Sequence, residues 1–259
     1  MEEKINNPVS PDYIPAEYQV PFDVIEIPSQ GILYKNKNKS IKVEYLTAFD
    51  ETILSSPNIS NSGNMTDILI KRKVKDLGFD PLDLLVSDRI AILLFLRSTA
   101  FGHEYKQLVV NKLGDVVEGT IDLSSLKQKK LSINPDADGL FDFVLPTTNQ
   151  IAKFRFLTGR DEVEIDELDS NYIKKTNDGI SNKLFFRLEK QVVSINGVTD
   201  KIKISNLLKN LSLKDSRLLR KYISEIEPGI DFDTTAGIHG GESVSCFLRC
   251  NSSFFFPEL

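Results

Sequence analysis

The sequence has few residues of the kinds that carry covalent or metal chemistry. Its 259 residues include no tryptophan, two histidines and two cysteines. The cysteines, Cys246 and Cys250, are too few for a disulfide framework of the kind that stabilises small secreted domains. We therefore expect the protein to be synthesised in a reducing cytosol.

Long apolar runs are also missing. The longest, residues 90–96, is far shorter than the roughly 20 residues that a membrane-spanning helix needs. The opening residues, MEEKINNPVSPDYIP, are acidic and rich in proline. They lack the basic-then-apolar order of a signal peptide. The sequence therefore predicts a protein without a membrane partner.

Positive charge is in short supply as well. The chain has 32 Lys and Arg against 37 Asp and Glu, a net charge of −5, which argues against a dedicated nucleic-acid binder. The compact basic run at residues 127–130, KQKK, is typical of a solvated loop, although a nucleic-acid adaptor that uses it remains an alternative. Hydrophobic residues make up 41% of the chain, enough for one large or two modest domains.

The two histidines do not stand in a recognisable catalytic pattern. His103 precedes Glu104, and His239 lies in the glycine-rich stretch 237–241. Neither a Ser-His-Asp order nor a Walker-type phosphate loop is present. We predict that the protein is not an enzyme and uses no cofactor; a hydrolase that uses His103 and Glu104 is the enzymatic alternative.

The candidate metal ligands form an incomplete set. Cys246 and Cys250, together with His239, supply three ligands, whereas a structural zinc site normally needs four. The acidic stretch at residues 161–169 lacks the alternating Asp order of a calcium loop and is typical of a solvated helix start. We predict no metal-binding residues, and a residual site near Cys246 and Cys250 stays open.

Local patterns predict mixed secondary structure in the first part of the chain. We expect a strand, a Pro/Gly turn and a return strand over residues 24–34, a polar hairpin tip at 35–39 and a half-buried strand at 41–45. Thr47 followed by Asp50 predicts a capping box, with Asp in the usual place of Glu.

Two helices and a hairpin follow in the expected order. The patterns predict one helix over residues 66–77 and another over 82–99, as a single helix or a short and a long one, with a stop near Gly102. Leu108-Val109-Val110 and Thr120-Ile121-Asp122-Leu123, on either side of a Gly-Asp turn, predict a β-hairpin.

The second half of the sequence resembles the first. An aromatic-Leu-Thr-x-x-Asp-Glu motif occurs at residues 45–51 and again at 156–162, each time after a Pro-containing strand. A helix predicted over residues 211–226 takes the place of the long helix of the first half. We therefore predict an α+β fold of two divergent repeats, each with a β-hairpin, helices and a small β tail. The predicted divisions are an extended N-terminal arm at 1–21, a first repeat at 22–132 and a second repeat at 140–259.

The last residues are unusually aromatic. They read Phe254-Phe255-Phe256-Pro257-Glu258-Leu259, and burying one Phe contributes roughly 1.5–3 kcal/mol. This segment should therefore dock, on its own chain or on a partner, and we favour its own chain. The proline-rich arm, with Tyr13 and Ile14, is the better candidate for contacting a neighbour, because such arms can order on binding. The predicted interaction residues are Phe254, Phe255, Phe256, Pro257, Tyr13 and Ile14.

Eight short motifs occur in order along the chain. They are Pro28-Ser29-x-Gly31-x-x-Tyr34, Val43-x-x-Leu46-Thr47-x-x-Asp50-Glu51, Asp80-Pro81-Leu82-Asp83-Leu84-Leu85-Val86-x-Asp88-Arg89, Phe101-Gly102-x-Glu104-Tyr105, Ser194-Ile195-Asn196-Gly197, Asp215-Ser216-Arg217-x-Leu219-Arg220, Pro228-Gly229-Ile230-Asp231 and Phe254-Phe255-Phe256-Pro257. Through these motifs the chain resembles the T4-type bacteriophage baseplate hub proteins over residues 22–259. The family often has a Cys-x-x-Cys pair after each long helix, which suggests a zinc-ribbon-like knuckle. This chain departs there, since residues 105–126 contain no cysteine.

The resemblance implies a structural role in a tail baseplate. It implies a subunit made and assembled in the host cytoplasm, located in the virion tail baseplate, and bound to other hub subunits in a hetero-oligomeric assembly. It implies neither nucleic acid nor membrane as a partner, and the β tails would be degenerate zinc-ribbon-like hairpins. An assembly chaperone that helps to build the hub and then leaves is the alternative within the same family.

Overall fold

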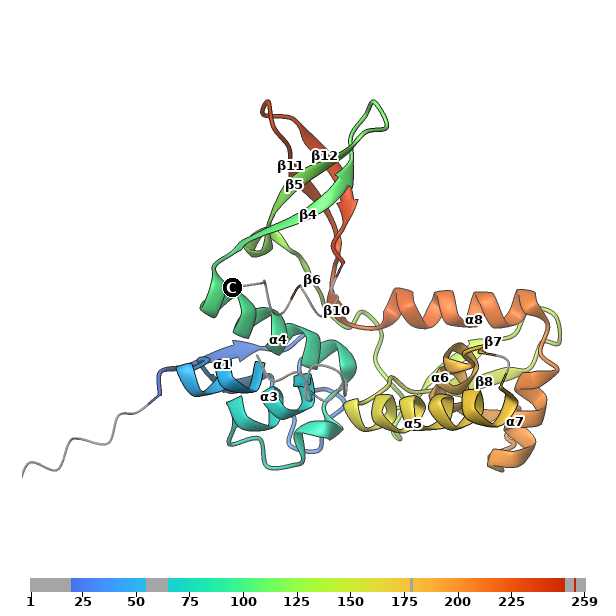
Figure 1. Cartoon of the computed structure of the whole chain (residues 1–259). Helices are drawn as coiled ribbons and strands as arrows, with labels where there is room; N and C mark the ends of the chain where they lie inside the picture. The colour runs from blue at the N-terminus through green and yellow to red at the C-terminus, as the bar shows by residue number, and fades with distance from the viewer. Residues whose placement is uncertain (1–19, 55–64, 178, 250–253, 255–259) are drawn as a thin grey trace, which may run out of the picture.

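The computed structural model describes residues 20–54, 65–177, 179–249 and 254 of the chain (Figure 1). This part of the chain is a mixed α+β structure, with seven α-helices and several small antiparallel sheets, as the sequence predicts. None of its helices has both the length and the apolar character needed to cross a membrane. The predicted N-terminal arm lies almost entirely outside the described residues.

The first half begins with a three-stranded sheet of order β1-β2-β3. β1 pairs antiparallel with β2, and two residues of β2 then pair with β3. Three α-helices and one 3-10 helix follow or flank this sheet. The elements are β1 (Phe22–Glu26), β2 (Ser40–Glu44), α1 (Ala48–Leu54), α3 (Met65–Lys73), β3 (Val74–Lys75), the 3-10 helix η1 (Pro81–Asp83) and α4 (Val86–Phe101).

Two of the predicted elements in this half are wrong in detail. The expected return strand near residues 32–34 is a series of turns, because the chain folds inward there to bury Tyr34. The helix expected over residues 66–77 ends at Lys73, since Val74 pairs with Val43 and joins the sheet. The stop near Gly102 is confirmed: Gly102 has a φ of 81° and caps α4, a conformation that glycine adopts without strain.

The second half has a similar order of elements. Its three-stranded sheet runs β7-β8-β9, again antiparallel throughout. Thr158 and Asp161 form a capping box at the start of α5, and Ser212 caps α8. The elements are β7 (Phe141–Val144), β8 (Ile151–Phe154), α5 (Gly159–Thr176), α6 (Lys183–Gln191), β9 (Val192–Ile195), α7 (Lys201–Lys209) and α8 (Leu213–Ile226).

The β tails of the two halves combine into one four-stranded sheet of order β12-β11-β5-β4. Figure 1 shows this sheet projecting away from the helices of both halves. The predicted hairpin of the first half is therefore confirmed, but it is only part of a larger sheet. A two-stranded pair, β10-β6, lies at its base. The elements are β4 (Glu104–Val110), β5 (Val116–Asp122), the 3-10 helix η2 (Leu123–Ser125), β6 (Gln128–Lys129), β10 (Gly229–Ile230), β11 (Asp233–Gly237) and β12 (Ser243–Phe247).

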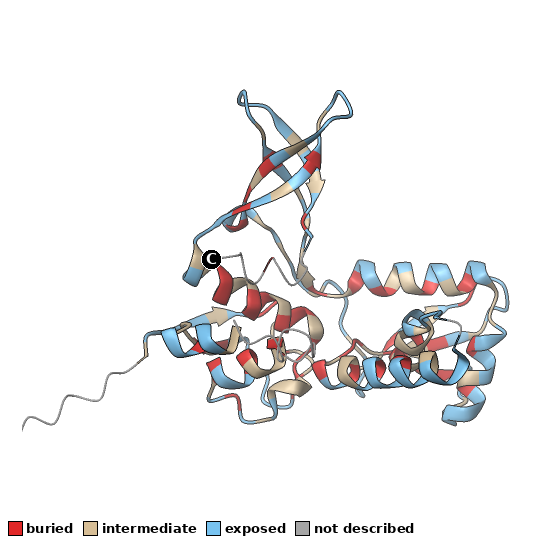
Figure 2. Cartoon of the chain, in the orientation of Figure 1, coloured by how far each residue is buried: buried red, intermediate tan, exposed pale blue. Residues whose placement is uncertain are grey.

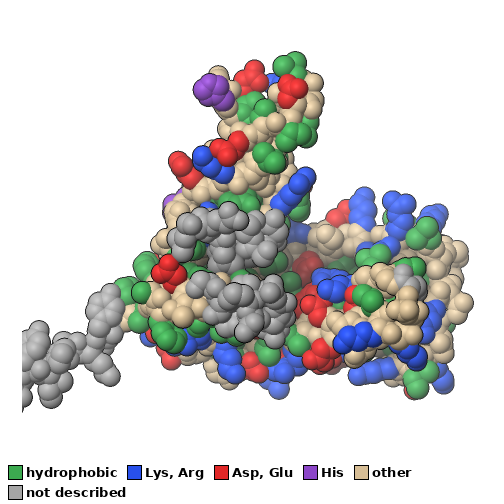
Figure 3. Space-filling model, in the orientation of Figure 1, with side chains coloured by type: hydrophobic (Ala, Val, Ile, Leu, Met, Phe, Trp, Pro, Cys, Tyr) green, Lys and Arg blue, Asp and Glu red, His purple; other side chains and the backbone are tan. Residues whose placement is uncertain are grey.

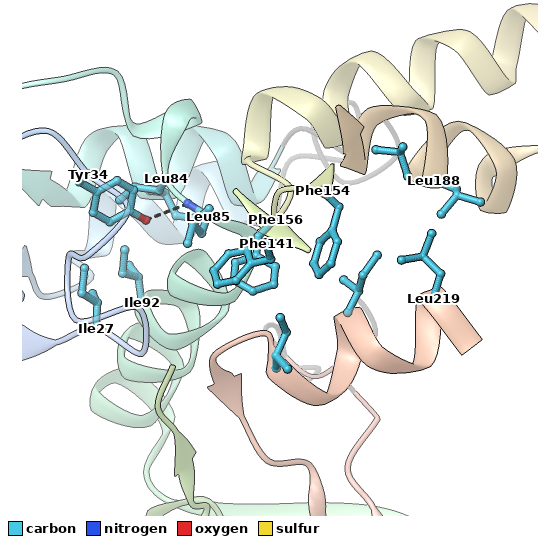
Figure 4. Close-up of a cluster of buried hydrophobic side chains, with 14 of the residues drawn as sticks. Ile27, Tyr34, Leu84, Leu85, Ile92, Phe141, Phe154, Phe156, Leu188 and Leu219 are labelled. Carbon is cyan, nitrogen blue, oxygen red and sulfur yellow. Dashed lines mark hydrogen bonds between the residues drawn. The ribbon is translucent and has the colours of Figure 1, made fainter. Parts of the chain in front are cut away.

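The main hydrophobic core is continuous across the two halves. Leu84 and Leu85 of the first half belong to the same buried cluster as Phe141 and Phe156 of the second (Figure 4). The rings of Phe141 and Phe156 have their centres 4.8 Å apart. Main-chain hydrogen bonds join the halves at this point, with the Gly159 N–H donating to the Leu84 oxygen at 2.9 Å. The two halves therefore share one core.

Each half also fixes the turn of its first hairpin with a buried aspartate. In the first half the Asp88 carboxylate accepts hydrogen bonds from the Ser29 N–H, at 2.9 Å, and from the Tyr34 hydroxyl. In the second half Asp215 accepts from the N–H and the hydroxyl of Thr147, at 3.0 and 2.9 Å. Each aspartate lies in the first turn of a helix, Asp88 in α4 and Asp215 in α8, where a negative charge is favourable.

Candidate interaction site

The C-terminal end of α4 carries a buried arginine that connects the projecting sheet to the helices. The Arg97 guanidinium donates to three main-chain oxygens, those of Gly102 at 2.7 Å, Phe254 at 3.2 Å and Glu104 at 3.3 Å. Burial lowers the pKa of Arg97 from its usual value. Three oxygens from separate parts of the chain thus compensate one buried cation, so Arg97 fixes their positions relative to α4.

Phe254 closes the small core under the sheet. Its side chain is 1% exposed and packs edge-on against Tyr105, with ring centres 4.9 Å apart. The Arg97 guanidinium lies 5.7 Å from the Phe254 ring centre, close enough for a cation–π contact. This core contains Tyr105, Val109, Ile121, Leu123, Ala236, Leu248 and Phe254.

Of the six predicted interaction residues, the structure therefore places Phe254 on its own chain. Its ring is an internal anchor of the sheet and is not available to a partner. The other five lie outside the described residues: Phe255, Phe256, Pro257, Tyr13 and Ile14.

The sheet is tightly curled, and its two edge strands approach each other. The Gln107 side chain of β4 donates to the Phe247 oxygen of β12 at 3.0 Å and accepts from the Arg249 N–H at 3.2 Å. A Cβ at Gly119 would lie 2.9 Å from side-chain atoms of Ala236 and Val109. Gly119 thus permits the close packing that brings the β tails of both halves together.

The outer face of the β4–β5 hairpin is apolar near its turn. Val110 pairs directly with Val116, so that both side chains lie on the same face. We call the set Leu108, Val110, Leu113 and Val116 the hairpin tip; these side chains are 65%, 57%, 87% and 65% exposed. Figure 2 shows that most of the projecting sheet is exposed, with a few buried positions along its strands.

Four exposed aliphatic side chains on a projecting hairpin indicate a binding surface. Scattered apolar side chains are normal on a protein, but a contiguous apolar patch rimmed by polar groups marks an interaction site. The rim here includes the exposed ion pair between Lys106 and Glu118, at 3.0 Å. The hairpin tip offers no nucleophile or acid–base group, so that its chemistry suits docking against an apolar surface.

The residues considered for catalysis or metal binding do not form a site among the described residues. His103 and His239 are exposed, and the His103 carbonyl accepts from the Leu123 N–H at 2.8 Å. Burial raises the pKa of the Cys246 thiol. Within the described ranges, no group of three His, Cys, Asp or Glu side chains could hold a metal ion. Cys250 lies outside them.

Sequence reasoning missed both Arg97 and the hairpin tip. Arg97 gives no signal of burial, because an arginine in a helix is normally exposed. The hairpin itself was expected, but consecutive valines at 109–110 and 116–117 do not show which of each pair faces outward. The register of β4 against β5 shows which valines share a face, and the burial of Val109 shows that Val110 and Val116 face outward.

The comparisons with known proteins add nothing to this geometry. The chain matches no family model, no curated protein and no solved structure.

Proposed function

We propose that this protein is a structural subunit of a bacteriophage tail baseplate hub and acts through protein–protein interfaces. The observation that carries the proposal is the apolar hairpin tip on a sheet that projects from the body of the molecule. A projecting apolar surface suits a subunit that docks into its neighbours. The resemblance of residues 22–259 to hub proteins supports the same assignment, and on this proposal those neighbours are other hub subunits.

We also propose that the two halves arose by internal duplication. The order hairpin, helices, third strand, long helix and β tail occurs in both. The Thr-Asp pairs at 47/50 and 158/161, in which the Thr N–H and hydroxyl both donate to the carboxylate, occupy matching places in that order. The buried aspartates, Asp88 and Asp215, do so as well. On this view the β tails descend from zinc-ribbon-like hairpins, and pairing between β5 and β11 takes over the stabilisation that a metal would give.

Purified tails provide the test of the hub assignment. Mass spectrometry with subunit counting should find the protein in intact tails at a fixed integer ratio. Absence from tails, together with presence in assembly intermediates, would instead establish the assembly chaperone. Absence from both would overturn the proposal.

A double variant tests whether the hairpin tip, and not another exposed surface, is the interface. Leu108→Asp with Val116→Asp should reduce incorporation into tails by about tenfold or more, because two charges would have to be buried at the interface. Val24→Asp is the control, since Val24 is 62% exposed on β1 and lies outside the hairpin. Equal incorporation of the tip variant and the wild type would show that the hairpin tip is not the interface.

A further inference from the structure

A second surface, on α7 and α8, differs from the hairpin tip in its chemistry. Between residues 201 and 221 the only acidic residue is Asp215, which is fully buried. The same segment exposes a series of cations although the whole chain has a net charge of −5. We call these side chains the basic face: Lys201, Lys203, Lys209, Lys214, Arg217 and Lys221.

The cations of α6, in the same half, form ion pairs with a neighbouring helix. Lys183, Arg187 and Lys190 each pair with an acidic side chain of α5. The positive charges of α6 are thereby neutralised by the helix that packs against it. The cations of a helix can thus find acidic partners within the chain. Most cations of the basic face have no such partner among the described residues.

Intramolecular partners are scarce on the basic face. Lys221 pairs with Glu225 at 3.6 Å, with both side chains well exposed, and such a pair contributes little. Across the ranges that the structure describes, no acidic side chain lies within ion-pair distance of Lys203, Lys214 or Arg217. Figure 3 shows blue side chains gathered over the part of the molecule that α8 and α7 occupy.

Exposed apolar side chains alternate with these cations along the same two helices. Ile202 is 74% exposed and Leu213 is 71% exposed, and Leu207 and Leu218 are partly exposed beside them. Sequence-independent binding of single-stranded nucleic acid uses aromatic side chains on which bases stack, and no exposed side chain between residues 201 and 221 is aromatic. A mixture of cations and aliphatic groups fits a protein surface better than phosphates.

We propose that the basic face binds an acidic segment of another protein, one in which Asp and Glu side chains alternate with a few aliphatic residues. The carboxylates would pair with the exposed cations, and the aliphatic groups would cover Ile202 and Leu213. Charge complementarity of this kind raises association rates and selects partners. The inference is independent of the hub assignment and concerns a surface separate from the hairpin tip.

The test measures binding of the full chain to a fluorescent amphipathic peptide made of glutamate, alanine and leucine. The wild type should bind it, and affinity should fall as salt is added, because exposed charges are screened. A triple variant, Lys203→Glu, Lys214→Glu and Arg217→Glu, should bind about tenfold more weakly or worse. Unchanged thermal unfolding would show that the triple variant is folded.

A matched control separates the basic face from the net charge. Lys35→Glu, Lys39→Glu and Lys71→Glu change the charge of the chain by the same amount, at exposed lysines of the first half. This control should bind the peptide nearly as well as the wild type. Equal weakening in both triple variants would overturn the proposal.

Three other outcomes would also overturn it. The first is an absence of peptide binding by the wild type. The second is tighter binding of a DNA duplex than of the peptide at equal salt, which would assign the basic face to nucleic acid. The third is self-association of the wild type that the basic-face variant abolishes, which would make a second copy of this chain the occupant.

Discussion

The two halves of the chain bury an aspartate in the same place but satisfy it differently. In the first half the Asp88 carboxylate has a donor for each oxygen, the Ser29 N–H and the Tyr34 hydroxyl. In the second half both donors of Thr147 converge on one oxygen of Asp215, and the other oxygen is buried without a hydrogen-bond partner. The second half therefore lacks a group equivalent to the tyrosine.

The difference follows from the lengths of the two hairpin turns. The first turn is long enough for Tyr34 to fold back under the sheet, where its hydroxyl also accepts from the Leu85 N–H at 2.9 Å (Figure 4). The second turn, between β7 and β8, is too short to supply such a residue. Both halves use an aspartate to anchor a hairpin turn to the start of a helix. They differ in whether a second side chain, Tyr34 in the first half, donates to the other carboxylate oxygen.

The largest expected effect is the loss of either aspartate, and it should be unequal. Asp88→Ala leaves the Tyr34 hydroxyl and the Ser29 N–H buried without an acceptor, so we expect a loss of about 3–5 kcal/mol in the free energy of unfolding. Asp215→Ala should cost about 1–3 kcal/mol, because one oxygen of that carboxylate has no partner to lose. Urea unfolding at neutral pH measures both. Equal losses would show that the tyrosine adds nothing to the first half.

Phe254 provides the next largest effect and a direct comparison with Phe247. Phe254→Ala should destabilise the protein by about 3 kcal/mol, because it empties the core between Arg97 and Tyr105. Phe247→Ala should change stability by less than about 1 kcal/mol, since its ring is 59% exposed. Hydrogen exchange in β4 and β5 should rise in the first variant only. A stable Phe254→Ala protein with unchanged exchange would contradict the anchoring role.

Glu227, at the end of α8, tests the region where the halves meet. Burial raises the pKa of Glu227 to about 7, whereas the pKa of a Glu in an unfolded chain is about 4.3. The folded state therefore binds more protons in this interval, and its stability is full below the unfolded pKa and falls as the pH rises through about 7.

Replacing this group with a neutral one should remove that loss. Glu227→Gln should gain about 1–3 kcal/mol at pH 8 relative to the wild type and little at pH 4. Thermal unfolding from pH 4 to 8 measures the effect. Two parallel stability profiles would mean that Glu227 keeps an ordinary pKa in the folded protein.

The smallest expected effects come from two Thr-Asp pairs at helix starts, the capping box of α5 at Thr158 and its counterpart before α1 at Thr47. Burial works to raise the pKa of Asp161, but hydrogen bonds from Arg155 and Thr158 outweigh it and hold that pKa below its usual value. Thr158→Ala removes an N-cap and should cost about 1 kcal/mol. Thr47→Ala should cost a similar amount, because the Thr47 hydroxyl donates to Asp50 at 2.8 Å. A much larger loss in the free energy of unfolding for one of these variants would show that the two Thr-Asp pairs are not equivalent.

The sequence predicts those parts of the fold that depend on neighbouring residues. The stop at Gly102 and the end of the helix at Ile226 depend on a few adjacent residues, and each is found where expected. The box expected at Thr47 is found in part: the Thr47 N–H and hydroxyl both donate to the Asp50 carboxylate, whereas the full reciprocal box is at Thr158 and Asp161. β3 was missed because Val74 and Lys75 continue a helical pattern, and only their pairing with β2 makes them a strand.

The candidate site is less predictable than the helices. Its sheet depends on pairing between β5 and β11, which lie far apart in the sequence and meet at Gly237 and Thr120. Local patterns carry no information about such a contact. The hydrophobicity of Phe254 predicts that it docks on its own chain or on a partner. Nothing in the sequence identifies Arg97 and Tyr105 as the residues that it contacts.

The projecting sheet contains strands from both halves of the chain, and this determines when it can form during synthesis. β4 and β5 leave the ribosome long before β11 and β12, so the inner face of the first hairpin stays uncovered until the second half emerges. Chains that stop early would expose Tyr105 and Val109, which Phe254 and the later strands otherwise cover. Such chains would carry the β4–β5 hairpin without the strands that cover its inner face. The sheet that is proposed to dock can therefore form only after β11 and β12 have been synthesised.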